Sequence, residues 1–153
     1  MTNPDFIYTT YIKSTPEKVW AAITNPEFAR QYWGHENISD WKQGSEWKMV
    51  AADGGEIKTV GKVLESSQPK RLVLSWASPQ NKSDESQVTF DLSVTGNLVR
   101  LDVVHTKLSA DMGRAVSGGW PRVLAGMKTF LETGEVLDIW AGQSSCGAKS
   151  TAA

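Results

Sequence analysis

The sequence predicts an α+β fold in which a curved antiparallel β-sheet wraps around a long C-terminal helix, with two short helices after the first strand. Two observations lead to this prediction. Several segments between residues 46 and 106 alternate apolar and polar residues with the period of two that strands show, and turn-forming residues separate them. Further on, six apolar residues recur at helical spacing and form one continuous stripe: Trp120, Val123, Leu124, Met127, Phe130 and Leu131.

The N-terminal part predicts a strand followed by a helix. Residues 6–13 are rich in aromatic and β-branched side chains, which favour strands. Ser14 and Glu17 have the spacing of a helix-capping box, and Pro16 suits a first helical turn. We therefore expect a helix that begins at about residue 15, immediately after the strand.

A second short helix is expected directly after the first. The residue before a proline avoids the helical conformation, so Asn25-Pro26 ends the first helix. The second runs to about Gln31. His35 follows in what we interpret as a loop, where polar residues are common regardless of function.

The central strands are expected to form hairpins. Asp53-Gly54-Gly55 is a strong hairpin-turn signal, and the polar interval 78–85, which contains Pro79, is interpreted as a loop. Neighbouring strands joined by short turns are antiparallel, and a sheet of this many strands must twist and curl. The expected strands lie within Glu46–Ala51, Glu56–Glu65, Leu72–Trp76, Val88–Val94 and Val99–His105.

The limits of the C-terminal helix are set by proline and glycine. Pro121 lacks a backbone N–H and is tolerated only in a first turn, so the main helix is predicted from about Gly119. Thr133-Gly134 fits its end. Residues 135–140 are predicted to pack back onto the domain. We expect residues 1–141 to form a single domain and residues 142–153, which are small and polar, to be a mobile tail.

Composition and charge exclude several classes of partner. The formal net charge is −1 and the pI is about 6.1, which argues against nucleic acid and against a polybasic membrane patch. Apolar runs fall well short of the roughly 20 residues that span a bilayer. The first five residues show no secretory signal pattern, so a cytoplasmic location is the expectation.

Sequence motifs for metals, cofactors and nucleophiles are also missing. Cys146 is the only cysteine, so an intrachain disulfide is impossible, and we interpret it as incidental. His35 and His105 have no third ligand at metal spacing, so no metal is predicted. The sequence contains no phosphate-binding loop, dinucleotide-binding glycine pattern or serine nucleophile elbow, and no cofactor is expected.

Five segments along the chain carry a recognisable pattern. They are Ser14–Trp20, Tyr32-Trp33, Pro69–Leu72 with Trp76, Gly118–Pro121 with Val123-Leu124, and Lys128 with Leu131–Gly134. Taken in order, these segments resemble the START-like (helix-grip) superfamily, and within it the single-domain bacterial-type family named for the activator of heat shock protein 90 ATPase. The resemblance implies a curved sheet gripping a C-terminal helix. It also implies a chaperone as an alternative partner and activation of its ATPase as an alternative function.

Seven tryptophans indicate either a heavily aromatic core or an aromatic-lined cavity. A curled sheet around a straight helix leaves a space that large side chains or a ligand must fill. We therefore predict that the protein binds a hydrophobic or aromatic small molecule between sheet and helix. The predicted lining residues are Trp33, Trp47, Met49, Trp76, His105, Trp120, Leu124 and Met127.

Alternatives to this prediction remain open at the level of sequence. The tryptophans would equally suit a plain packed core. His105 is either a buried histidine bonded to a backbone group or a polar contact or proton donor for a ligand. A cyclase or hydrolase using His105 would need an acid, but the strand pattern places Asp102 on the opposite face. Homodimerisation through an exposed strand or tryptophan is also left open.

Overall fold

The computed structural model of the protein describes residues 5–142, and the alternating segments of the sequence form one seven-stranded antiparallel sheet. The strand order is β1-β7-β6-β5-β4-β3-β2. The strands are β1 (Phe6–Ile12), β2 (His35–Ile38), β3 (Glu46–Ala51), β4 (Ile57–Ser67), β5 (Arg71–Ser78), β6 (Asn81–Thr95) and β7 (Leu98–Thr106). The helices are α1 (Pro16–Thr24), α2 (Pro26–Trp33) and α3 (Ala110–Thr133).

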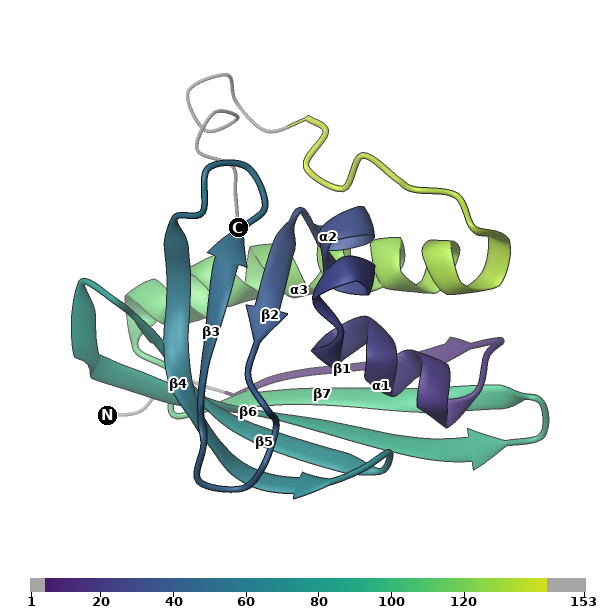
Figure 1. The fold of residues 1–153 in the computed structure, drawn as a ribbon, viewed down its shortest axis with the longest axis horizontal. Helices are drawn as coiled ribbons and strands as arrows, with labels where there is room; N and C mark the ends of the chain where they lie inside the picture. The colour runs from purple at the N-terminus through teal and green to yellow at the C-terminus, as the bar shows by residue number, and fades with distance from the viewer. Residues whose placement is uncertain (1–4, 143–153) are drawn as a thin grey trace.

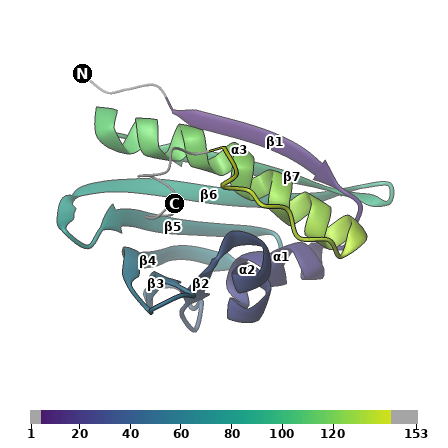
Figure 2. The ribbon, with the colours of Figure 1, turned by 90° about the horizontal axis from the view of Figure 1, so that it is seen from above.

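The sheet curves around α3, which runs across its concave face (Figures 1 and 2). The short helices α1 and α2 lie beside the C-terminal half of α3, where Phe28 and Tyr32 contact the ring of Phe130. The predicted fold class is therefore confirmed, including the two short helices after the first strand. Among residues 5–142, no helix is both long enough and apolar enough to cross a bilayer.

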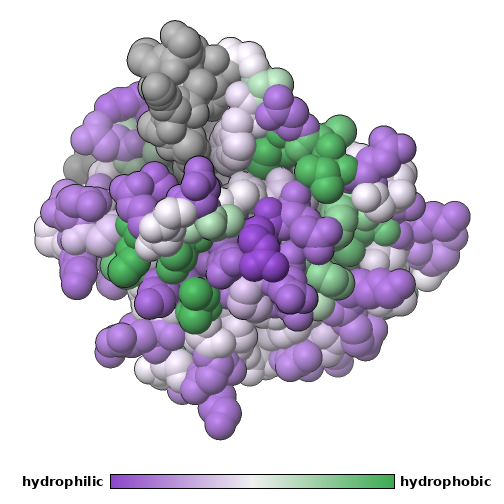
Figure 3. All heavy atoms as spheres, turned by 45° about the horizontal axis from the view of Figure 1, so that its top comes forward, coloured by the Kyte–Doolittle hydropathy of each residue, from purple (hydrophilic) through white to green (hydrophobic). Residues whose placement is uncertain are grey.

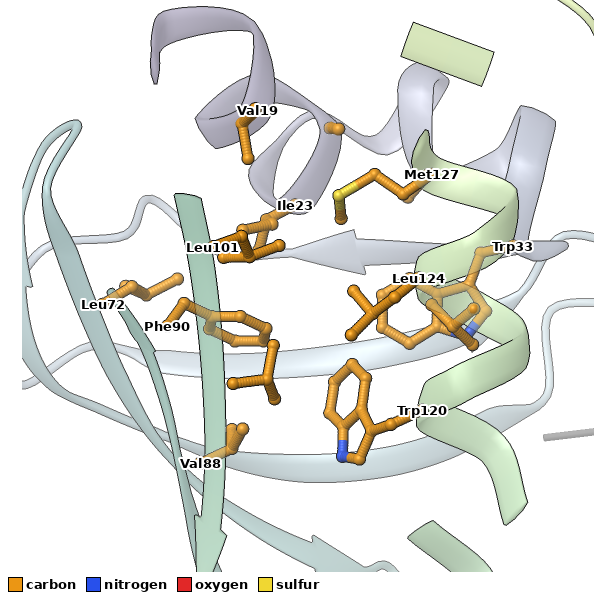
Figure 4. Close-up of a cluster of buried hydrophobic side chains, with 14 of the residues drawn as sticks. Val19, Ile23, Trp33, Leu72, Val88, Phe90, Leu101, Trp120, Leu124 and Met127 are labelled. Carbon is orange, nitrogen blue, oxygen red and sulfur yellow. The ribbon is translucent and has the colours of Figure 1, made fainter. Parts of the chain in front are cut away.

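The core lies between α1, the inner face of the sheet and α3. Figure 4 shows Val19 and Ile23 of α1 above strand residues such as Leu101, with Leu124 of α3 facing them. All four side chains are almost fully buried. Burial of side chains of this size contributes about 1.5–3 kcal/mol each, so this cluster fixes the helices on the sheet.

The ends of α1 and α2 are set by local capping, with one correction to the prediction. The N-cap of α1 is Thr15, whose hydroxyl accepts the Lys18 N–H at 3.3 Å, and not Ser14 as predicted. The Ser14 hydroxyl is buried and has no hydrogen-bond partner among the described residues. Asn25 ends α1 and caps α2, because its side chain accepts the Glu27 N–H at 2.9 Å.

Helix α3 begins nine residues before the predicted start. Its N-cap is Ser109, whose hydroxyl accepts the Met112 N–H at 3.0 Å, and Pro121 lies inside the helix. An internal proline costs about 3 kcal/mol because it removes an N–H and crowds the carbonyl four residues earlier. That carbonyl belongs to Ser117, an exposed residue at which water can replace the lost donor. Burial of Val116 ahead of the proline helps to offset the cost.

Two further expectations about local structure are wrong. The interval 78–85, interpreted as a loop, contains only a tight turn, and β6 begins at Asn81, which pairs with Ser78 of β5. His35 lies in strand β2, paired with Ala51 of β3, and is 3% exposed. Both segments are polar, so their strand character comes from pairing with neighbouring strands and not from an apolar pattern.

The segment after α3 returns along the helix, as predicted for part of it. Ile139 is buried against Gly126, and Arg122 donates hydrogen bonds to the carbonyls of Ile139 and Ala141 at 2.7 and 2.9 Å. Val136 and Leu137 are exposed instead of packed. The predicted mobile tail begins at residue 142, and residues 143–153, with Cys146, lie outside the described part of the chain.

Strand β4 approaches β5 closely at Gly61. At this point side-chain groups, and not only backbone groups, form the hydrogen bonds between the strands. The Lys62 N–H donates to the Ser75 hydroxyl at 2.8 Å, and the Ser75 carbonyl accepts the Trp47 indole N–H at 2.8 Å. A Cβ atom on Gly61 would lie 1.9 Å from the Ser75 carbonyl oxygen and 2.6 Å from the Trp47 nitrogen. Only glycine fits at this position.

We predict that Gly61→Ala lowers the free energy of unfolding by about 3 kcal/mol, because the added methyl group separates β4 from β5 and breaks the Trp47 hydrogen bond. Gly113→Ala is the control, since its Cβ would meet only Leu108 at 3.9 Å inside a helix. The control should be neutral or stabilising by up to about 1 kcal/mol. Urea unfolding measures both changes, and equal stability of the two variants would contradict the prediction.

Candidate functional site

A cleft of about 350 Å³ lies between the N-terminal half of α3 and the inner face of the sheet. Its wall is aromatic and is built by side chains from α2, β3, β5, α3 and the segment that follows α3. The wall residues are Trp33, Met49, Trp76, Trp120 and Trp140. Small residues of α3, Ala115 and Gly119, face the same space, which is why the helix does not fill it.

The wall is part of a continuous row of tryptophans. The ring centroid of Trp120 lies 5.8 Å from that of Trp33 and 5.5 Å from that of Trp76. Trp47 follows at 5.4 Å from Trp76, and Trp41 at 6.4 Å from Trp47. Tilted aromatic contacts contribute about 0.5–1.5 kcal/mol each beyond area burial, so the row is a stiff surface. Figure 4 shows the Trp33 and Trp120 rings close to Leu124 of α3.

His105 lies directly behind this wall and is fully buried. The Trp120 indole N–H donates to His105 Nδ1 at 3.1 Å, so Nδ1 is the acceptor and the proton of the neutral ring is on Nε2. Nε2 then donates to the Ser86 hydroxyl at 2.8 Å, and that hydroxyl donates to the Trp76 carbonyl at 3.0 Å. Burial lowers the pKa of His105 to about 4, so the ring is neutral at physiological pH.

His35 is a second buried histidine on the same side of the sheet. Its ring meets that of Trp33 edge-on at 6.3 Å between centroids. Its Nδ1 atom has no hydrogen-bond partner among the described residues. Burial, assisted by the positive charge of Lys58, lowers the pKa of His35 to about 4. His35 is therefore neutral at physiological pH. The positive charge near it at the polar end of the cleft is that of Lys58.

The structure places the eight predicted site residues in two groups. Four line the cleft: Trp33, Met49, Trp76 and Trp120. The other four are buried outside it: Trp47, His105, Leu124 and Met127. Trp47 also borders a second hollow of about 500 Å³, whose other residues include Lys48 and Lys62 of the outer face. His105 supports two rings of the cleft wall, because it accepts the hydrogen bond of the Trp120 indole and meets the Trp76 ring edge-on at 5.3 Å between centroids.

The sequence interpretation did not include the polar residues of the cleft. Lys58, Asp84, Asp111 and Asn81 all line it, as does Trp140. Asn81 and Asp84 belong to the interval that was interpreted as a loop, and Asp111 to the unpredicted start of α3. Trp140 carried a usable signal, since residues 135–140 were expected to pack back. Lys58 follows the polar positions of a regular strand, and nothing in the alternation distinguishes it.

The face of the molecule that Figure 3 shows is mostly hydrophilic. Apolar side chains on that face gather in separate patches between hydrophilic ones. Within residues 5–142, no group of three or more histidine, cysteine or carboxylate side chains comes together as a metal site would require. The expectation that no metal is bound remains a prediction.

Comparison with known proteins gives the family. The family model described as Activator of Hsp90 ATPase homolog 1-like protein matches residues 13–132. The chain belongs to this family. The resemblance stated from the sequence motifs is thus confirmed, and the match covers α1, α2, strands β2 to β7 and almost all of α3, while β1 precedes it. No curated protein matches the chain.

Solved structures share this fold. CalU16 from Micromonospora echinospora is 25% identical with a TM-score of 0.69, over 85% of this chain and 77% of its own. An HSP90 activator from Plasmodium falciparum is 23% identical with a TM-score of 0.71, over 83% and 95%. The Aha1 dimer from Colwellia psychrerythraea is 21% identical with a TM-score of 0.71, over 87% and 99%. The last two likenesses show the fold alone.

The two buried histidines predict a loss of stability in acid. Their pKa values are about 4 when folded and 6.5 when unfolded, so below pH 6.5 the unfolded state binds protons that the folded state does not. Stability is complete above pH 6.5 and falls toward pH 4, by about 2 kcal/mol per histidine between pH 7 and pH 5. Chemical unfolding of wild type and of His35→Gln at both pH values measures this, and the variant should lose about 2 kcal/mol less. An identical loss in the two proteins would contradict the assignment.

Proposed function

We propose that this protein binds an apolar, aromatic small molecule in the cleft between α3 and the sheet. The observation that supports this most is the cleft itself, a space of about 350 Å³ whose wall consists of four indole rings and a methionine. Small-molecule sites typically occupy about 300–1,000 Å³, are mostly apolar and carry a few polar groups that orient the ligand. Lys58, Asp84 and Asp111 are the charged groups of this cleft.

The energetics favour a flat apolar ligand. Each Å² of apolar surface removed from water contributes about 25 cal/mol, so burying 200 Å² gives roughly 5 kcal/mol before the costs of association. Those costs are smaller when the site is already formed. Here the Trp120 ring is held by His105 and by two neighbouring indoles, so little rotamer freedom is lost on binding.

The proposal assigns binding and no reaction. Both ring nitrogens of His105 are engaged, by Trp120 and by Ser86, so the ring has no free lone pair to act as a base. Asp102, the acid nearest to it in the strand, instead accepts a hydrogen bond from Thr9 at 2.5 Å and pairs with Arg100. No carboxylate among the described residues is bonded to His105.

A chaperone-activating role is the second candidate, and membership of the family favours it. Such a protein would raise the ATPase rate of an Hsp90-type chaperone on addition. The rise would be the same for wild type and for a variant with a blocked cleft, because surface docking does not need the cavity. Comparing the two proteins in one ATPase assay therefore separates activation from small-molecule binding.

We predict that Gly119→Leu abolishes ligand binding without unfolding the protein. Gly119 lines the cleft, and a Cβ atom there would have no atom within 4 Å, so the new side chain enters open space. Gly118→Leu is the matched control, because it makes the same change at an exposed helical position outside the cleft. Both variants gain about 1 kcal/mol of helix propensity.

The measurement is tryptophan emission and melting temperature during titration with neutral aromatic compounds such as indole, 2-naphthol and flavone. Wild type and Gly118→Leu should bind the same members of the panel. Gly119→Leu should bind them at least about tenfold more weakly, since the leucine occupies the ligand's volume. If no compound of the panel shifts either signal in wild type, and no aromatic acid of similar size binds either, the proposed function fails. Equal binding by the two leucine variants would place the ligand outside this cleft.

A further inference from the structure

Lys58 enters the cleft because of a β-bulge, and this places one positive charge at one end of the aromatic wall. In the β3–β4 pair, Met49 faces Thr59 while the next residue, Val50, faces Ile57. Lys58 is therefore the extra residue and has no partner across the ladder. A bulge redirects the side chain of its extra residue, and Lys58 lines the cleft beside Met49 and Thr59 instead of pointing to the outer face with Lys48 and Lys62.

The Lys58 ammonium group makes only a weak ion pair within the described part of the chain. Its side chain is 25% exposed, and its one ion-pair partner among the described residues is Glu56 at 3.2 Å, with a side chain that is 67% exposed. An ion pair with so exposed a partner contributes little and can be exchanged for a ligand group. The ammonium group has three donors, so two remain available. The neighbouring Thr59 hydroxyl makes only a long contact, 4.0 Å, to the Met49 sulfur.

The opposite side of the cleft mouth is acidic. Asp84 lies near the start of β6 and accepts a hydrogen bond from Ser109 at 2.8 Å, and Asp111 in the first turn of α3 pairs with Arg114. Strand β5 lies between β4 and β6, so Lys58 and Asp84 come from strands that are not neighbours in the sheet. Among the described residues that line the cleft, Lys58 is the only cation.

On the basis of the proposed function, we infer that the ligand is an aromatic monocarboxylic acid with its carboxylate on the Lys58 ammonium and its rings on the Trp33, Trp76 and Trp120 wall. The Thr59 hydroxyl is the second donor to the carboxylate. Asp84 and Asp111 repel a second anionic group at the other end, so the ligand carries one acidic end and an uncharged body. The fixed charges of the mouth set the direction in which the ligand enters.

The test uses a matched pair of probes, naphthalene-2-carboxylate and naphthalene-2-carboxamide, in calorimetric titrations of the full chain. The two differ in charge and hardly in shape, so their affinity ratio isolates the ionic contact. Wild type should bind the carboxylate about tenfold more tightly than the carboxamide, the usual advantage of a charge-assisted hydrogen bond. Lys58→Gln should remove that preference by weakening carboxylate binding alone.

Lys62→Gln is the control, because it removes the same charge from the same strand on the outer face. It should leave both affinities unchanged. The inference is overturned if Lys58→Gln weakens both probes equally or neither, or if wild type binds the carboxamide as tightly as the carboxylate. In those cases binding itself stands and the proposed function survives. If neither probe binds and the neutral panel is also silent, the proposed function fails together with the inference.

Discussion

The hydrogen bond from the Trp120 indole to His105 is the contact on which the arrangement of helix and sheet depends. It begins a chain that continues through Ser86 to the Trp76 carbonyl, and it joins α3 to β7, β6 and β5. A buried polar chain of this kind is stable only when every member is satisfied, so it permits one rotation of α3 and one tautomer of His105. The neutral ring of His105 can accept the Trp120 N–H, and this hydrogen bond holds the Trp120 ring in the aromatic wall.

The two halves of α3 then have different roles. C-terminal to Trp120, Leu124 and Met127 are about 1% exposed and fill the space against α1 and the sheet. N-terminal to it, Ala115 and Gly119 are too small to reach the sheet, and the cleft opens there. Close packing leaves few voids in native proteins, so a space of this size needs a specific cause. Here the cause is the order of small and large residues along α3. The cleft is thus determined by side-chain size at fixed helical positions.

The sequence predicted the fold class, and four of the eight residues predicted to line the cleft do line it. Both successes depend on alternation and on the helical stripe, which record which face of an element is buried. The prediction failed where tertiary contacts outweigh local preference. Pro121 argued for a later helix start, but the cost of an internal proline is offset by packing of residues such as Val116. His35 is buried because β2 pairs with β3, and the sequence has no apolar alternation there that would predict a strand. Ser14 and Thr15 are adjacent and both can cap a helix, and only the hydrogen bond from the Lys18 N–H to Thr15 distinguishes them.

The charged residue Lys58 of the cleft could not be predicted from the sequence, and the reason lies in the pairing of β4. Strand β4 departs from regular pairing twice, at the bulge that contains Lys58 and at the bulge near Leu64, and between them Gly61 lets the Trp47 indole bond to β5. Each bulge shifts the phase of alternation by one residue, so a residue that the pattern assigns to solvent faces the cleft. Phase shifts leave the composition of the strand unchanged. Among the described residues, the one cation that lines the cleft is therefore set by pairing between β3 and β4, which the sequence pattern does not record.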